Sequence, residues 1–342
     1  MSTATVETVR RWSQRLPHIS PIWPVMVLLF LVSPLLAAGS ADTSALRSMI
    51  PFAALLAIAS VGQSIVMRQR GLDLSVPGCV TLAAMVVTEY CGGHGSRLFV
   101  GILLAYLACI LGGVVIALAV TLLRLTPLVA TLGMNSVYIG VALYITGGVS
   151  TEQSPANLSN FALGSTAGIS NIAIVAVVLI AVGGFLVGRT VAGRRFALLA
   201  ENPAASRVAG IRVRSYLSWT FVAASGCYAT TGILLAGFLQ TPDLTVGTNY
   251  LLSTVAAVVL GGMSLGGRGN LVLSTAAGAL FLTQLNQVVL GTSTSPSTQY
   301  IVQGAVIAVA MLVPTLRLPQ RLRRASPPSS PTTPILERTS TP

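Results

Sequence analysis

Long apolar segments alternate with short polar ones along almost the whole chain. A helix that spans a bilayer needs about 20 predominantly apolar residues, with a range of roughly 17 to 25. On this measure the pattern predicts ten spans, and therefore an all-α polytopic membrane protein. The predicted spans are residues 21–39, 48–67, 74–91, 98–123, 126–146, 171–189, 215–239, 248–264, 270–290 and 298–316.

The composition agrees with a membrane protein and excludes a soluble domain. Apolar residues make up 53% of the chain and charged residues 8%, whereas soluble domains carry about 25% charged residues. A net charge of +12 would suggest nucleic-acid binding in a soluble protein, but here the arginines lie at the ends of apolar segments, as in cytoplasmic loops. We therefore expect a lipid membrane, and no nucleic acid, as the partner of this basic chain.

The 20 basic residues are all arginine, and this limits the chemistry of the chain. Without lysine there is no phosphate-binding loop of the G-x-x-x-x-G-K-[ST] type, so ATP hydrolysis by that route is expected on another chain. Cys79, Cys91, Cys109 and Cys227 are scattered through apolar segments without metal-ligand spacing, which predicts small core residues. We expect no catalytic residue, no metal and no cofactor on this chain.

The distribution of arginine predicts the orientation. If the N-terminus is inside the cell, 18 arginines lie in cytoplasmic segments and only Arg47 and Arg97 lie outside, which is a strong positive-inside signal. Ten spans then place both termini in the cytoplasm. The predicted organisation is a cytoplasmic segment at 1–20, a transmembrane domain at 21–316, and a disordered tail at 317–342 that is rich in Pro, Ser and Thr.

The cytoplasmic loop at 190–214, between the sixth and seventh predicted spans, carries a helix signature. Asn202 can cap a helix by accepting a backbone N–H bond, Pro203 suits the first helical position, and Gly210 can take the left-handed conformation that ends it. A helix of about two turns is marginal in water alone, so it must pack on this domain or on a partner. Two interpretations remain open: a docking element for a partner, or an amphipathic connector on the lipid headgroups.

The polar residues predicted at membrane depth are uncharged. Helical spacing places Thr131 beside Asn135, and Gln299 beside Gln303, on one helix face. Such a lining suits an uncharged solute rich in hydroxyl groups, and the alternative is hydrogen bonding between helices. The full set is Gln63, Ser64, Thr131, Asn135, Thr230, Thr231, Ser253, Thr254, Thr283, Gln284, Asn286, Gln287, Gln299 and Gln303.

Acidic residues and histidines are predicted to lie at span ends or outside the spans. Asp73, Glu89 and Asp243 are at span ends, so the pattern predicts no buried acid. Ion-coupled carriers usually bury such a group at depth, which argues against that class. No cluster of His, Cys, Asp or Glu converges on one membrane face, which argues against an integral-membrane enzyme.

Four stretches, in order within about residues 48–315, resemble the permease subunit of ribose-type ABC sugar importers. They are GLDLSV at Gly71–Val76, ATLGMNSVYIGVALYITGG at Ala130–Gly148, ENPAASRVAGI at Glu201–Ile211 and VLGGMSLGGRGN at Val259–Asn270. The chain departs from the family pattern at two places. Pro77 stands where the family usually has glycine, and Ala204 or Ala205 replaces an acidic residue often found early in the family's coupling helix.

The resemblance implies a permease of the bacterial inner membrane that moves a pentose, hexose or related polyol. Its implied partners are an ABC ATPase subunit that holds ATP and Mg²⁺, a periplasmic or lipid-anchored sugar-binding protein, and a second permease subunit, identical or different. The alternative is an ion-coupled secondary transporter of a small uncharged solute. The residues implied in ATPase coupling are Glu201, Asn202, Pro203, Ala204, Ala205, Ser206, Arg207 and Gly210. With the uncharged lining, the resemblance suggests a solute path through Asp73, Ser75, Thr131, Asn135, Thr283, Gln284 and Asn286.

Overall fold

The computed structural model describes residues 22–37, 39–40, 42–150, 152–263 and 272–292, together with a few positions between 298 and 308. The predicted N-terminal segment at 1–20 and tail at 317–342 lie outside the described residues, as do Gln299, Gln303 and most of the tenth predicted span.

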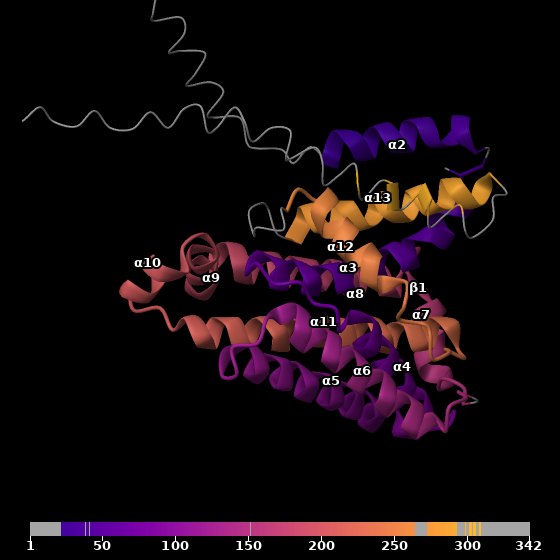
Figure 1. The fold of residues 1–342 in the computed structure, drawn as a ribbon. Helices are drawn as coiled ribbons and strands as arrows, with labels where there is room; N and C mark the ends of the chain where they lie inside the picture. Colours follow the sequence, from indigo (N-terminus) through magenta and orange to yellow (C-terminus); the bar gives the residue numbers. More distant parts are fainter. Residues whose placement is uncertain are drawn as a thin grey trace, which may run out of the picture.

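The described residues form a bundle of long helices that run side by side (Figure 1), so the prediction of an all-α polytopic membrane protein is confirmed. The main helices are α2 (Ile22–Leu36), α3 (Thr43–Arg68), α4 (Val76–Cys91), α5 (Leu98–Thr121), α6 (Pro127–Thr146), α8 (Asn171–Arg189), α11 (Val213–Leu239), α12 (Tyr250–Leu260) and α13 (Val272–Gly291). Of the described helices, six are long and apolar enough to cross a membrane, whereas α2, α4 and α12 are shorter.

The two longest helices in this list, α3 and α11, form the centre of the bundle. Helix α11 packs against α3, α4 and α5, and α3 packs also against α12 and α13. Glycines allow the close approach: a β-carbon at Gly62 would lie 2.8 Å from the ring of Tyr228 on α11, and one at Gly232 would overlap the carbonyl oxygen of Val80 on α4. Helices α6 and α8 are mostly exposed, so they lie at the periphery, available to lipid or a partner subunit.

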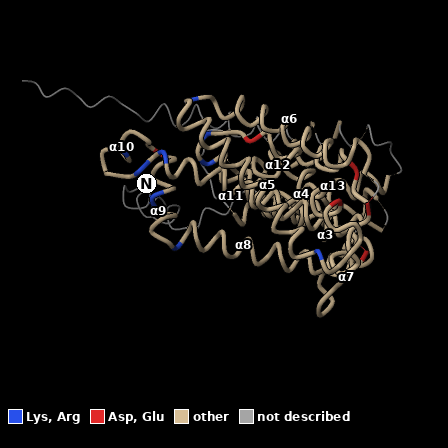
Figure 2. Tube along the Cα trace, turned by 90° about the horizontal axis from the view of Figure 1, so that it is seen from below, with Lys and Arg blue, Asp and Glu red and all other residues tan. Residues whose placement is uncertain are grey.

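Two ends of the bundle differ in what they carry. One end, which we call the α10 end, carries α9 (Val191–Glu201) and α10 (Pro203–Val208) between α8 and α11. Most described arginines gather there (Figure 2). The opposite end, which we call the cavity end, carries α7 (Ala156–Leu163) and a hairpin of β1 (Ser165–Thr166) and β2 (Ile169–Ser170), paired antiparallel. A short 3-10 helix, η1 (Gly95–Arg97), precedes α5.

Helices α4 and α12 are short because the chain before each of them is not helical. Residues 71–75 run without regular structure between α3 and α4, and Asp73 within them is only 1% exposed. The prediction that the chain buries no acid is therefore wrong at Asp73. The physical reason is that the chain turns back into the bundle before α4 begins, and irregular backbone at membrane depth is tolerated where protein covers it.

Candidate solute cavity and docking helix

A cavity of about 530 Å³ opens at the cavity end, between α3, α11, α12 and α13. Its apolar wall comes from the first turns of α3 and the last turns of α11, with Phe52, Leu56, Leu235 and Leu239. The polar lining consists of Ser48, Asp243, Thr245, Asn249, Ser253, Thr283, Asn286 and Gln287. A concave apolar site of this size, with a few convergent polar groups, is typical of small-molecule binding sites.

Asp243 is the only acid in that lining, and its own turn fixes its position. One carboxylate oxygen, Oδ1, accepts hydrogen bonds from the backbone N–H of Thr245 at 2.7 Å and from the Thr245 hydroxyl at 2.8 Å. The side chain is exposed to the cavity. The rest of the polar lining is hydroxyl and amide groups, which suit an uncharged solute with many hydroxyl groups.

The predicted path residues fall into three places. Thr283 and Asn286, one turn apart on α13, both line the cavity. Gln284 is fully buried and does not line it, since its amide Nε2 donates to the carbonyl of Ser40 at 3.4 Å, between α2 and α3. The other four, Asp73, Ser75, Thr131 and Asn135, lie together away from the cavity.

These four residues form one hydrogen-bonded cluster at the start of α4. Asp73 Oδ1 accepts from the Ser75 N–H at 2.9 Å and the Ser75 hydroxyl at 2.6 Å. Thr131 Oγ1 accepts from the N–H of Leu74 at 3.0 Å, and Asn135 Oδ1 accepts from the N–H of Gly78 at 2.8 Å. The shared helix face predicted for Thr131 and Asn135 therefore supports α4, because it satisfies donors that a helix start leaves free. Their role in the solute path stays a prediction.

Sequence reasoning missed several cavity residues as path candidates. Ser48 and Asn249 were not singled out, and Asp243 was placed only at a span end, yet all three line the cavity. A signal for Asp243 was nevertheless present in the sequence. The run Asp243–Val246, DLTV, repeats the run Asp73–Val76, DLSV, which the resemblance had already singled out.

Helix α10 has the ends that the sequence predicted. Asn202 Oδ1 accepts from the N–H of Ala205 at 3.0 Å, Pro203 is the first helical residue, and Gly210 has φ +77°. Ala204 and Ala205 are exposed on the helix. The remaining predicted coupling residues include Ser206, which is buried, and Glu201 and Arg207, which are exposed. The exposed side of α10 therefore carries the small side chains of Ala204 and Ala205.

Helix α9, directly before α10, was not predicted. The Thr190 hydroxyl caps its start by accepting from the N–H of Gly193 at 3.0 Å. Its apolar side chains, Phe196 and Leu199, are buried against the bundle. The sequence carries a signal for this helix, since Thr190 can cap it and apolar residues follow with helical period.

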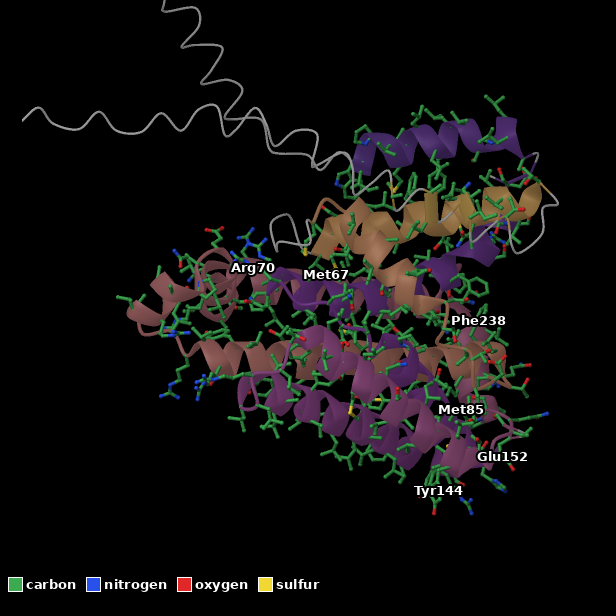
Figure 3. All side chains as sticks on the ribbon, viewed as in Figure 1. Met67, Arg70, Met85, Tyr144, Glu152 and Phe238 are labelled. Carbon is green, nitrogen blue, oxygen red and sulfur yellow. The ribbon has the colours of Figure 1, made fainter. Side chains whose placement is uncertain are left out.

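The loop after α3 holds α9 in place. The Arg70 guanidinium donates to the carbonyls of Ala200 and Glu201, each at 3.1 Å, and Gln69 Nε2 donates to the carbonyl of Phe196 at 3.1 Å. The carbonyls of Ala200 and Glu201 lie in the last turn of α9, where intrahelical partners run out. Figure 3 shows Arg70 at the α10 end, far from Phe238 at the cavity end. Helix α9, which leads directly into α10, is therefore tied to the loop that contains Asp73.

A second contact joins the cluster at α4 to the cavity loop. Thr81 on α4 accepts a hydrogen bond from the N–H of Gly247 at 3.1 Å, in a buried position. A β-carbon at Gly247 would overlap the carbonyl oxygen of Pro77, so only glycine fits there. Pro77 itself is accommodated within the first turn of α4, where a missing N–H is harmless. Helix α4 thus contacts both irregular segments.

A bundle of apolar helices with a polar cavity at one end and a capped, exposed helix at the other fits a membrane transport permease, and the comparisons show that class. The family model described as "Branched-chain amino acid transport system / permease component" matches residues 46–311. The chain belongs to this family, and the predicted resemblance to ribose-type ABC importer permeases is confirmed.

Among curated relatives, the chain is similar to proteins named "Autoinducer 2 import system permease protein LsrC". The protein of Enterobacter sp. (strain 638) is 33% identical over 237 residues, which cover 69% of this chain and 68% of the relative. The protein of Escherichia coli (strain SMS-3-5 / SECEC) is 30% identical over 266 residues, covering 78% and 77%. No solved structure matches the chain significantly. The chain is therefore a multi-pass inner-membrane permease subunit of an ABC importer.

Proposed function

We propose that this chain is the pore-forming subunit of an importer that carries a pentose, hexose or related polyol. A periplasmic or lipid-anchored binding protein delivers the solute at the cavity end, which faces outward. A separate ATPase subunit docks on α10 at the cytoplasmic end, and a second permease subunit, identical or different, completes the pore. Both termini are cytoplasmic in this arrangement.

The cavity is the observation that carries the proposal. It has a volume of about 530 Å³, and its polar lining consists of hydroxyl and amide groups with one carboxylate. Hydroxyl groups of a solute can donate to these oxygens and accept from the amides, while the apolar wall of Phe52 and Leu235 packs against its carbon face. Autoinducer 2, the cargo in the relatives' names, belongs among the solutes to be tested.

The docking role of α10 is supported by its shape. Its surface includes Ala204 and Ala205, whose small side chains let a short helix sit deep in a partner's cleft. Arg70 and Gln69 fix α9 beneath it, so a push on α10 is transmitted to the bundle instead of bending a loose loop. A connector that only lies on lipid headgroups would not need these bonds.

Reconstitution tests the proposal. The tagged chain is purified from its native membranes with its associated subunits, placed in proteoliposomes with the binding protein, and offered labelled pentoses, hexoses, polyols and autoinducer 2. We expect uptake of one of these solutes that requires ATP at the α10 face. Uptake by this chain alone, driven by an ion gradient without ATP, would instead support the secondary transporter and contradict the proposal.

A further inference from the structure

The segments after α3 and α11 are repeats of each other. Asp73–Val76 reads DLSV and Asp243–Val246 reads DLTV, and Gly62 and Gly232 precede them at the same spacing. The residues three positions before each aspartate, Arg70 and Gln240, both have positive φ, at +62° and +66°, which non-glycine residues rarely adopt. The bonds around them differ, since the N–H of Gly71 donates to the carbonyl of Val66 at 3.2 Å and that of Thr241 to the carbonyl of Leu239 at 2.8 Å. The repeated device is therefore the aspartate turn that follows each helix.

The side chains of the two repeats make the same turn. In each, the aspartate Oδ1 accepts two hydrogen bonds from the residue two positions later, one from its backbone N–H and one from its hydroxyl. The distances are 2.9 and 2.6 Å at Ser75, and 2.7 and 2.8 Å at Thr245. In both turns Oδ1 is fixed, and the second carboxylate oxygen, Oδ2, is left for another partner.

The repeats lie at opposite ends of the bundle. Helix α3 runs toward the α10 end, where Arg70 contacts α9, and α11 runs toward the cavity end, where Phe238 is labelled (Figure 3). The Asp73 turn therefore follows a helix that ends on one side of the membrane, and the Asp243 turn follows one that ends on the other. Inverted repeats of this kind place equivalent groups at the two entrances of a transport path.

The surroundings of the two aspartates differ. Asp243 is exposed and lines the cavity, whereas Asp73 is 1% exposed. Among the described residues Asp73 Oδ2 makes no hydrogen bond, because the neighbouring Tyr228 hydroxyl donates to Gln63 Oε1 at 3.1 Å. A buried carboxylate oxygen without a partner is costly. That cost is relieved when the covering helices move apart and a donor reaches the oxygen. The described conformation is thus open at Asp243 and closed at Asp73.

We propose that Asp73 and Asp243 are equivalent acceptor sites for the hydroxyl groups of the transported solute, used in turn at the two ends of the path. Asp243 accepts them while the cavity end is open, and Asp73 accepts them when the α10 end opens. The inference rests on the proposed function and deepens it. An uncharged polyol suits both sites, because its hydroxyls are donors and bring no charge that would bind the carboxylate too tightly to leave.

The contact between Gly247 and α4 couples the two sites. Gly247 lies against Pro77 and bonds to Thr81, so the loop that carries Asp243 moves with the helix that follows Asp73. A shift of α4 that uncovers Asp73 therefore displaces the Asp243 loop at the same time. Opening of one site and closure of the other become a single motion.

Asn substitutions separate binding from a purely structural role. Asp73→Asn and Asp243→Asn keep an Oδ1 that can accept both turn bonds, but they replace Oδ2 by an N–H₂ donor. The solute is whichever one the wild type takes up in the reconstitution experiment. We expect the ATP-driven uptake rate of each variant to be roughly tenfold to hundredfold below the wild-type rate, as for loss of a hydrogen bond to a charged group. Glu152→Gln, a half-buried acid at the cavity end that does not line the cavity, is the matched control and is expected to transport normally.

Thiol labelling tests the alternation itself. Leu74→Cys and Leu244→Cys occupy equivalent, half-buried positions and leave both turns intact. Each is placed in a chain whose four cysteines are replaced by alanine. A charged methanethiosulfonate reagent is applied to one face or the other of the assembled complex. The labelling rate is measured for the complex without nucleotide and for the complex trapped with ATP and vanadate. We expect the two labelling rates to change in opposite directions between these states, with Leu74→Cys labelled from the α10 face and Leu244→Cys from the cavity face.

The outcomes distinguish the inference from the proposed function. Normal uptake by both Asn variants, or rates for the two cysteines that rise and fall together, overturns the alternation while ATP-driven uptake by the wild type leaves the importer standing. Absence of any ATP-driven uptake by the wild type overturns the proposed function, and the inference with it.

Discussion

Replacing Arg70 is expected to release α9, and with it the proposed docking helix α10, from the loop after α3. The guanidinium makes two hydrogen bonds, each 3.1 Å long, to the last carbonyls of α9. Hydrogen bonds that involve a charged group are worth about 1.5 to 3 kcal/mol, and the exposed position of one of these bonds argues for the lower end. We take about 2 kcal/mol for the part-buried bond to Ala200 and nothing for the exposed bond to Glu201, so loss of the pair lowers the ratio of tethered to untethered α9 about thirtyfold.

The assay measures uptake and ATP hydrolysis in the same proteoliposomes. Arg70→Ala should keep most of its ATPase activity, because α10 and its cap at Asn202 are intact, yet its uptake per ATP should fall severalfold. Arg124→Ala is the matched control. Arg124 is also an exposed arginine with positive φ, at +56°, but no hydrogen bond joins it to α9 among the described residues.

The backbone at Arg70 offers a second check on this reasoning. Its φ of +62° strains any residue with a β-carbon, at a cost of about 1 to 2 kcal/mol that glycine does not bear. Arg70→Gly should therefore be at least as stable as Arg70→Ala and equally uncoupled. Uptake per ATP that stays at the wild-type value in both variants would show that the tether carries no force.

Three further predictions follow from other contacts. Cysteines at Ser165 and Ala204, both exposed, should be labelled by an impermeant reagent from opposite membrane faces; labelling of both from one face contradicts the orientation. Gly247→Ala should reach the membrane but transport poorly, because its β-carbon overlaps the Pro77 carbonyl; normal uptake would show that this contact is not needed. Asn286→Leu should raise the KM for uptake severalfold, whereas Gln284→Leu, outside the cavity, should not. A raised KM in Gln284→Leu alone would show that the solute passes Gln284 and not this cavity.

The sequence predicted the main helices well because apolar length is a strong signal. Helices α5, α6 and α8 begin and end within about two residues of the predicted spans. The signal fails where helix ends lie inside the protein. Asp73 was placed at a span end, because an extended segment that returns into the bundle has no distinct pattern in hydropathy.

The candidate site was only partly predictable, for a related reason. Asn202, Pro203 and Gly210 act on their own backbone, so local rules predict the ends of α10. Whether Gln284 or Asn286 faces the cavity depends on which neighbours surround α13, and this is a property of the assembled bundle. Polar residues two positions apart on one helix point in different directions, and sequence alone did not distinguish them.

The bonds that Thr131 and Asn135 make to the start of α4 have a consequence for the order of synthesis. Helix α4 leaves the ribosome before α6, yet the N–H groups of Leu74 and Gly78 are satisfied only by side chains of α6. The buried acid Asp73 just before α4 adds to the cost of exposing this segment to lipid. We therefore expect α4 to stay near the insertion machinery until α6 is made, so that α4 to α6 enter the lipid together.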